Sequence, residues 1–178
     1  AAGRPETHPE RSLRIAAGGV ALILLLQLGS ALAFYPYYYT YYNPIMAGLN
    51  GGTPAYDYGE GFELAAAYLA QKPDAESLKV FSFRGRGPFS FFFPGQTIIL
   101  NPLFIEEPHM GSMVERLAKA DYLVFNDAME HRTERTALFV NALDGVEPEK
   151  NISVNGSSTI HIYRVADLPP SFYEAIQK

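Results

Sequence analysis

The side chains best suited to chemistry in this chain lie in two glycine-containing stretches. One of them, FRGRGPFSFFF at residues 83–93, places Arg84 and Arg86 in a loop directly after a predicted strand. Guanidinium groups bind phosphate oxygens through paired hydrogen bonds, so these two arginines are candidate phosphate-binding residues. The pattern favours a second interpretation, in which both arginines are solvated and the phenylalanines that follow belong to the core. Those phenylalanines are Phe89, Phe91 and Phe92.

The other stretch is YGEGFE, residues 58–63. It contains a G-x-G pattern but lacks the third glycine and the preceding strand of a dinucleotide-binding site, so we reject nucleotide binding there. Glu60 lies at the predicted entrance of a helix, where a carboxylate interacts favourably with the helix dipole. That structural role is the favoured interpretation of Glu60, and a ligand-binding role is the alternative.

The remaining sequence carries few signs of catalysis. Its four histidines are not spaced as metal ligands, and His161, within an alternating strand, is expected to be a packed or exposed side chain. The absence of cysteine excludes disulfides and thiolate metal sites, and no G-x-S-x-G motif is present. We expect no metal and no cofactor. The net charge of −5 argues against a nucleic-acid partner.

An apolar run near the N-terminal end predicts a transmembrane helix at residues 13–35. No charged side chain occurs from Ile15 through Tyr56, and about 20 apolar residues suffice to cross the hydrocarbon core of a bilayer. Arginines precede the run and none follows it closely. The positive-inside rule therefore makes residues 1–12 a cytoplasmic flank and places the rest of the chain outside the cytoplasm.

Residues 36–56 are predicted to be an aromatic connection next to the membrane. Six tyrosines occur between Tyr35 and Tyr42, and amphipathic rings of this kind prefer the membrane–water interface. A signal peptide cleaved after Ala33 is an alternative interpretation of the apolar run. A buried helix of a soluble protein is a third, weakened by the length and uniformity of the run.

Residues 57–178 are predicted to form a small extracytoplasmic α/β domain with a mixed sheet and a C-terminal hairpin. Ser112 and Thr133 are the predicted N-caps of two helices, and Asn155-Gly156 is the predicted hairpin turn. Helices are predicted at 61–73, 112–120, 133–143 and 169–178, and strands at 77–83, 96–100, 121–127, 150–154 and 158–165. The buried face of the first helix is predicted to comprise Phe62, Ala65, Ala66 and Leu69.

Several of these motifs together resemble the C-terminal region of bacterial glycosyltransferase family 39 proteins, relatives of the dolichyl-phosphate-mannose protein mannosyltransferases. The segments that carry the resemblance are YPYYYTYYNPIMAG, YDYGEGFELAAAYLAQKP, ADYLVFND and STIHIYRV. Residues 41–44 match an aromatic YYNP motif of the family, and residues 59–61 match its GEG turn, with Tyr58 in place of the usual tryptophan. The resemblance covers nearly the whole chain from the predicted membrane helix onward.

The resemblance implies a multi-pass membrane enzyme that moves a sugar from a polyprenyl-phosphate donor to an acceptor outside the cytoplasm. The family's catalytic carboxylate lies in an earlier loop, so this chain is expected to be a non-catalytic C-terminal portion with no catalytic residue of its own. Its expected partners are membrane lipid and, through the full-length protein, the polyprenyl-phosphate-linked sugar. The candidate substrate-binding residues are Tyr41, Tyr42, Asn43, Glu60, Arg84 and Arg86.

An alternative from a different class remains open. The chain would then be a single-pass anchored, or secreted, extracytoplasmic binding or scaffold domain without enzymatic activity. The size of the natural gene product distinguishes this alternative from the transferase.

Overall fold

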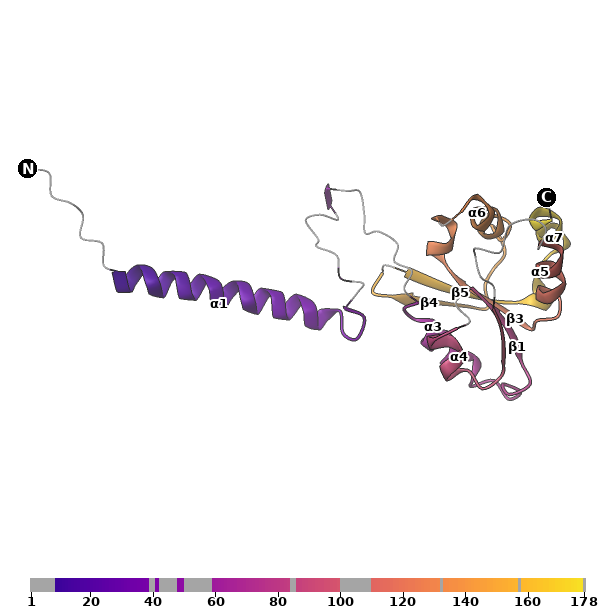
Figure 1. Ribbon diagram of the computed structural model, residues 1–178, viewed down its shortest axis with the longest axis horizontal. Coiled ribbons are helices and arrows are strands. Elements are labelled where there is room, and N and C mark those ends of the chain that lie inside the picture. Colours follow the sequence, from indigo (N-terminus) through magenta and orange to yellow (C-terminus); the bar gives the residue numbers. More distant parts are fainter. Residues whose placement is uncertain are drawn as a thin grey trace, which may run out of the picture. The chain divides into compact units, whose positions relative to one another are not determined.

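A computed structural model describes residues 9–38, 41, 48–49, 59–83, 86–99, 110–131, 133–156 and 158–177. The chain divides into two compact units, Ala1–Tyr41 and Tyr42–Lys178. The first contains one long helix, and the second contains an α/β domain (Figure 1). Each unit is described by itself below.

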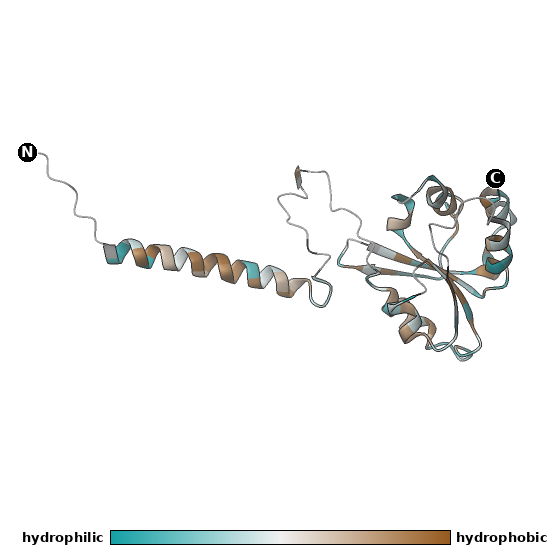
Figure 2. Ribbon diagram, viewed as in Figure 1, coloured by the Kyte–Doolittle hydropathy of each residue, from teal (hydrophilic) through white to brown (hydrophobic). Residues whose placement is uncertain are grey.

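Helix α1 spans Pro9–Ala33, and the described residues of the first unit that follow it are mostly in turns. Its section Glu10–Ala33 is long and apolar enough to cross a membrane, and none of that section is buried within the protein. Figure 2 shows hydrophobic residues along most of its length. Large aliphatic side chains such as Leu25 and Leu26 are about two-thirds exposed, at 66% and 65%. A helix this apolar on all sides needs a nonpolar environment, which water does not supply.

The second unit is built on a five-stranded mixed sheet in the order β2-β1-β3-β5-β4. The strands are β1 Lys79–Ser82, β2 Gln96–Ile99, β3 Tyr122–Asn126, β4 Lys150–Val154 and β5 Ser158–Arg164. Strand β1 pairs in parallel with both β2 and β3, whereas β5 runs antiparallel to β3 and to β4. The α/β class, the mixed sheet and the C-terminal hairpin predicted from the sequence are therefore confirmed.

Helices cover both faces of this sheet (Figure 1). One face carries α3 and α4, and the other carries α5, α6, α7 and the short helix η3. Their bounds are α3 Phe62–Leu69, α4 Pro88–Phe92, α5 Met110–Leu117, η3 Asp127–His131, α6 Glu134–Asn141 and α7 Pro170–Ile176, with a second short helix, η4, at Val165–Asp167. Alternate strand residues serve the two cores: Val80 and Val124 pack toward α3, whereas Phe81 and Leu123 pack toward α5 and α6.

The order of strands makes the carboxyl ends of β1 and β3 a topological switch point. Strand β1 leads to β2 through α4 on one face, and β2 leads to β3 through α5 on the other, so β2 and β3 lie on opposite sides of β1. Ligands of open α/β sheets bind at the carboxyl ends of strands where the winding reverses in this way. The fold therefore singles out the edge formed by Ser82 and Asn126.

Several local predictions are confirmed. The side chains of Phe62, Ala65, Ala66 and Leu69 are all fully buried, as the spacing on α3 predicted. Thr133 caps α6, since its hydroxyl accepts a hydrogen bond from the Thr136 amide at 3.1 Å. The hairpin between β4 and β5 turns at Asn155 and Gly156, which adopt positive φ angles of 49° and 67°. Positive φ at both central residues is the geometry that Asn-Gly favours in a hairpin turn.

Two local predictions are wrong. Ser112 lies inside α5, which includes Met110 and Gly111, so it does not cap that helix. Phe91 and Phe92 were expected in the core, but they are 81% and 53% exposed, and only Phe89 of the three is buried. The reason is the short helix α4, which was not predicted from the sequence: it places successive residues on different sides, so its two exposed phenylalanines cannot follow Phe89 inward.

Candidate functional site

The described part of the chain includes three of the six predicted substrate-binding residues. Tyr41 belongs to the first unit, where its ring contacts that of Phe34 edge to face, with centroids 5.2 Å apart. Glu60 and Arg86 belong to the α/β domain, where each stands just before a helix, α3 and α4 respectively, on the same face of the sheet. The other three predicted residues, Tyr42, Asn43 and Arg84, lie outside the described residues.

The surroundings of Glu60 are set by two glycines. Gly59 and Gly61 adopt φ angles of 99° and 80°, a region that residues with a Cβ avoid. A Cβ on Gly61 would also lie 2.5 Å from Val154 Cγ2, so only glycine lets the start of α3 approach the β4–β5 hairpin so closely. The GEG turn thus holds Glu60, itself partly buried, at a fixed place where α3 meets the hairpin.

Arg86 is exposed at the carboxyl end of β1. Gly87 follows with a φ of 86°, and Pro88 begins α4. This places Arg86, a candidate phosphate-binding residue, on the side of the sheet where the switch point lies. The exposure of Arg86 also fits the interpretation in which it is solvated.

The carboxyl ends of β1 and β3 bring polar side chains together. Ser82 ends β1 and Asn126 ends β3, and both are buried. Asp127 follows Asn126 directly and accepts a hydrogen bond from His161 on β5, with 2.5 Å between Oδ1 and Nε2. The other ring nitrogen of His161 lies 2.7 Å from Oδ1 of Asn151 on β4. One histidine therefore connects three elements at this edge.

The contacts of His161 restrict its protonation. Nε2 faces a carboxylate oxygen, which only accepts, so Nε2 carries a proton. Nδ1 donates to the amide oxygen of Asn151, or accepts from its NH₂ group if that amide is turned over, since the oxygen and nitrogen of the amide occupy equivalent positions in the two orientations. In both arrangements each ring nitrogen has a partner, so His161 acts here as a connector with no nitrogen left to bind a metal.

Asp127 is held in its charged form. Its partial burial favours the neutral carboxyl, but the hydrogen bond and charge of His161, together with hydrogen bonds from Thr159, outweigh burial and lower the pKa of Asp127 below 3.8. A carboxyl with a lowered pKa is a poor general acid near neutral pH. Asp127 therefore carries a fixed negative charge just after the end of β3.

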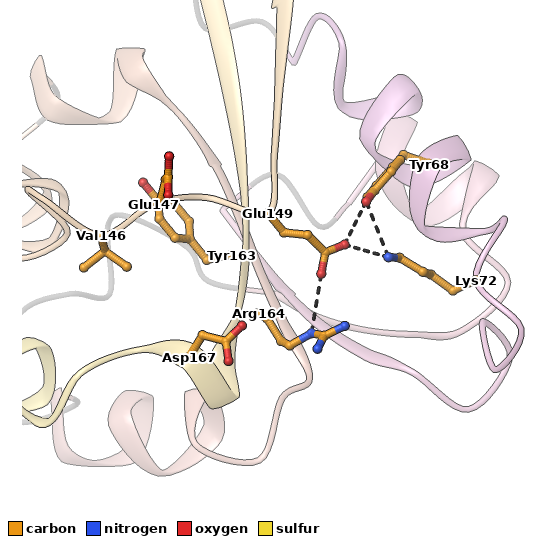
Figure 3. A pocket seen from close by; sticks show the side chains of 8 residues that line it. All are labelled: Tyr68, Lys72, Val146, Glu147, Glu149, Tyr163, Arg164 and Asp167. Atoms are coloured by element: carbon orange, nitrogen blue, oxygen red, sulfur yellow. Dashed lines mark hydrogen bonds and ion pairs between the residues drawn. The ribbon is translucent and has the colours of Figure 1, made fainter.

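A second polar cluster surrounds Glu149, at the opposite end of the parallel strands (Figure 3). Its Oε1 accepts hydrogen bonds from Tyr68 at 2.8 Å and from Lys72 at 2.6 Å. Its Oε2 accepts from Tyr122 at 3.3 Å and lies 3.4 Å from Nε of Arg164. The carboxylate thus joins α3, β3 and β5 to the segment that precedes β4.

The Glu149 carboxylate and the Lys72 ammonium stabilise each other's charged form. Desolvation opposes ionisation of Glu149, but hydrogen bonds from Lys72 and Tyr68 outweigh it and lower its pKa. The hydrogen bond to Glu149 raises the pKa of Lys72 and is also the largest cause of the raised pKa of Tyr68. The Lys72 ammonium lies 5.0 Å from the Tyr68 ring centroid, which adds a cation–π contact. These groups form an ion cluster that stays charged near neutral pH.

A cavity of about 420 Å³ lies beside this cluster. Its volume is within the range of small-molecule sites, but its walls are polar and bear more carboxylates than cations. Its walls comprise Tyr68, Lys72, Val146, Glu147, Glu149, Tyr163, Arg164 and Asp167 (Figure 3). Such a cavity suits a small hydrophilic ligand. Glu149 itself has a structural role, because both of its carboxylate oxygens already have partners.

Neither polar cluster was identified from the sequence. The sequence held one signal for the cluster at Asp127. Asn126 and Asp127 come directly after a run of apolar strand residues, and polar residues at a strand's carboxyl end mark the ligand-binding edge of α/β sheets. No comparable signal marked Glu149, because its partners come from residues 68 to 164 of the chain. Among the described residues no group of three His, Cys, Asp or Glu side chains is arranged to hold a metal ion.

Comparison with known proteins adds no relative to this picture: no protein-family model matches the chain, and neither a curated protein nor a solved structure does.

Proposed function

We propose that the chain is the non-catalytic C-terminal portion of an integral-membrane glycosyltransferase. In this proposal α1 crosses the membrane and the α/β domain stands on the extracytoplasmic side, where the parent enzyme moves a sugar from a polyprenyl-phosphate donor to an acceptor. The observation that carries the proposal is an exposed, apolar 24-residue helix section joined to a separate, fully formed α/β domain. The basic residues Arg11 and Arg14 on its N-terminal side support the outward orientation.

The enzyme class in this proposal is supported by the GEG turn and the YYNP segment that resemble glycosyltransferase family 39. The structure gives the GEG turn a physical reason, since Gly61 admits the β4–β5 hairpin and fixes Glu60 at the start of α3. A motif with such a structural requirement is retained when a fold is reused, so it supports shared ancestry of the domain more directly than shared chemistry.

The second candidate is an anchored binding domain without enzymatic activity. The specific observation in its favour is the doubly wound sheet, whose switch point lies at the carboxyl ends of β1 and β3. These strands end in the buried Ser82 and Asn126, and Asp127, which follows, is hydrogen-bonded to His161. This edge has the position of a ligand site.

The test is the size and membrane partitioning of the natural gene product, tagged at its C-terminus. A product several times heavier than 19.7 kDa that leaves membranes only with detergent is the expected result. A detergent-dependent product of about 19.7 kDa would refute the transferase and favour the anchored binding domain. Release by high salt or alkaline carbonate would refute membrane anchoring itself. Protease added to intact cells should remove the tag, because the domain is proposed to lie outside.

A further inference from the structure

Two adjacent phenylalanines on α4 point away from the core. Phe91 is 81% exposed and Phe92 is 53% exposed, and their rings contact each other edge to face with centroids 5.0 Å apart. Phe89 and Phe93, on either side, are buried against the sheet. The helix is thus held to the domain by one pair of phenylalanines while it presents the other pair, the Phe91–Phe92 pair, outward.

An exposed pair of this size is uncommon on a domain surface. Single exposed apolar side chains are ordinary, but adjacent large ones indicate a surface that is covered in the working protein. Among the described residues from Gly59 onward, the other large apolar side chains that are exposed are leucines: Leu64, at 41%, on α3, which packs beside α4, and Leu138, at 50%, on α6. Leu138 lies on the opposite face of the sheet and serves below as a control.

The charged residues that surround the pair in the sequence are basic. No acidic residue occurs in the sequence between Glu76 and Glu106, whereas Lys79, Arg84 and Arg86 do. Arg86 is exposed and lies two residues before α4. An aromatic pair whose own stretch of sequence carries cations and no carboxylate matches the interface of a bilayer that contains anionic lipid.

The chain itself limits how far this surface lies from a membrane. Twenty-five residues separate Ala33, the end of α1, from Gly59, the first residue of the described domain. Whatever their conformation, they cannot span more than about 90 Å. If α1 is anchored, the domain is confined near the bilayer, and a weak second contact becomes effective through its high local concentration.

We propose that α4 is a second membrane contact of this chain. The Phe91–Phe92 pair enters the headgroup region, and Arg86 lies against anionic headgroups. Five residues are too few to cross the hydrocarbon core, so α4 lies in the interface. This inference rests on the proposed anchoring by α1, and it goes beyond that proposal by assigning a lipid-facing side to the α/β domain.

The absence of cysteine lets one introduced thiol report its own surroundings. The full chain would be placed in lipid nanodiscs containing anionic lipid and a nitroxide-bearing lipid, with a small fluorophore on Ser90→Cys, an exposed position of α4 that leaves both phenylalanines intact. The matched control is the same fluorophore on Leu138→Cys. We expect headgroup-region nitroxide to quench the Ser90→Cys probe several-fold more than the Leu138→Cys probe.

Two further measurements identify the cause. Adding Phe91→Ser and Phe92→Ser to the Ser90→Cys chain should remove the excess quenching, whereas adding Leu138→Ser should not. Nanodiscs of zwitterionic lipid alone should reduce the excess, since Arg86 then loses its anionic partner. Excess quenching that survives both serine substitutions would overturn the proposal.

A probe on Leu25→Cys, in α1, separates this inference from the anchoring on which it rests. Quenching of that probe by nitroxide on the acyl chains, with equal weak quenching at Ser90→Cys and Leu138→Cys, would overturn the α4 contact and leave the anchor intact. No acyl-chain quenching at Leu25→Cys would refute the anchor, and the α4 contact would fall with it. A Ser90→Cys probe shielded from aqueous iodide but not quenched by lipid nitroxide would show a protein occupant, which also overturns the proposal.

Discussion

Replacement of Gly61 by alanine tests why glycine is required at the start of α3. The reason is either the close approach of the β4–β5 hairpin together with the positive φ angle, or the φ angle alone. The new Cβ would lie 2.5 Å from Val154 Cγ2 and 2.9 Å from Ile160 Cδ1. Neither neighbour can move aside easily, because Val154 is 3% exposed and Ile160 is fully buried. The backbone φ of 80° adds a second cost for any residue that carries a Cβ.

Three terms set the expected loss of stability. A left-handed conformation costs alanine about 1–2 kcal/mol. Overpacking a filled core costs a further ~1–3 kcal/mol, and the lower entropy of unfolded alanine returns about 0.4–1 kcal/mol. The expected net loss for Gly61→Ala is therefore about 1–5 kcal/mol, centred at about 3 kcal/mol. For a domain of this size such a loss lowers Tm by roughly 10 °C.

Gly59→Ala is the matched control for this prediction. Gly59 has a similar positive φ of 99°, but a Cβ there would meet nothing within 4 Å. It should lose only the backbone term, about 1 kcal/mol, or roughly 3 °C in Tm. The assay is thermal unfolding of the full chain in nonionic detergent, followed by near-ultraviolet circular dichroism of the domain's tyrosines.

Equal shifts in the two variants would refute the role of close approach. A second check is the double variant Gly61→Ala, Val154→Ala, which removes the nearest clashing atom. It should be less destabilised than the sum of its two single changes, because residues in contact are energetically coupled. Strict additivity would mean that Val154 does not require glycine at position 61.

Two further predictions concern the domain and its charged edge. Residues 57–178 alone should unfold in one cooperative transition in detergent-free buffer, because helices cover both sheet faces within this range, and a broad, non-cooperative melt would contradict this. The pKa of Asp127 in the folded protein lies below its ordinary 3.8. The contact of Asp127 with His161 therefore stabilises the fold at pH values above 3.8. This stabilisation is lost as the pH falls through the lower, folded-state pKa. Asp127→Asn should therefore lower the urea midpoint at neutral pH, with a difference from the parent that shrinks in acid; a difference independent of pH would contradict the assignment.

Local signals in the sequence were sufficient for most of the secondary structure. The hairpin follows from Asn155-Gly156, which tolerate the positive φ angles that the turn requires. Thr133 caps α6 because a short hydroxyl side chain can reach the amide of Thr136 three residues later. The same reasoning failed at Ser112, where α5 already includes the two residues before it.

Local signals did not determine which side chains of residues 88–93 are buried. A run of aromatic residues predicts burial by composition, but burial depends on which way a helix as short as α4 faces the sheet. That orientation comes from the packing of Phe89 and Phe93 into one buried cluster with residues distant in the sequence, such as Phe62 and Ile160. Composition therefore could not separate the buried phenylalanines from the Phe91–Phe92 pair.

The sequence by itself determined that one long apolar helix precedes an α/β domain with a mixed sheet, because hydrophobic length and periodicity are properties of neighbouring residues. Only the tertiary structure decided where polar groups meet. His161 reaches Asp127 across 34 positions, and Glu149 reaches Tyr68 across 81. Contacts of this separation depend on the strand order β2-β1-β3-β5-β4, which brings segments distant in the sequence together at both ends of the parallel strands and which no local pattern encodes.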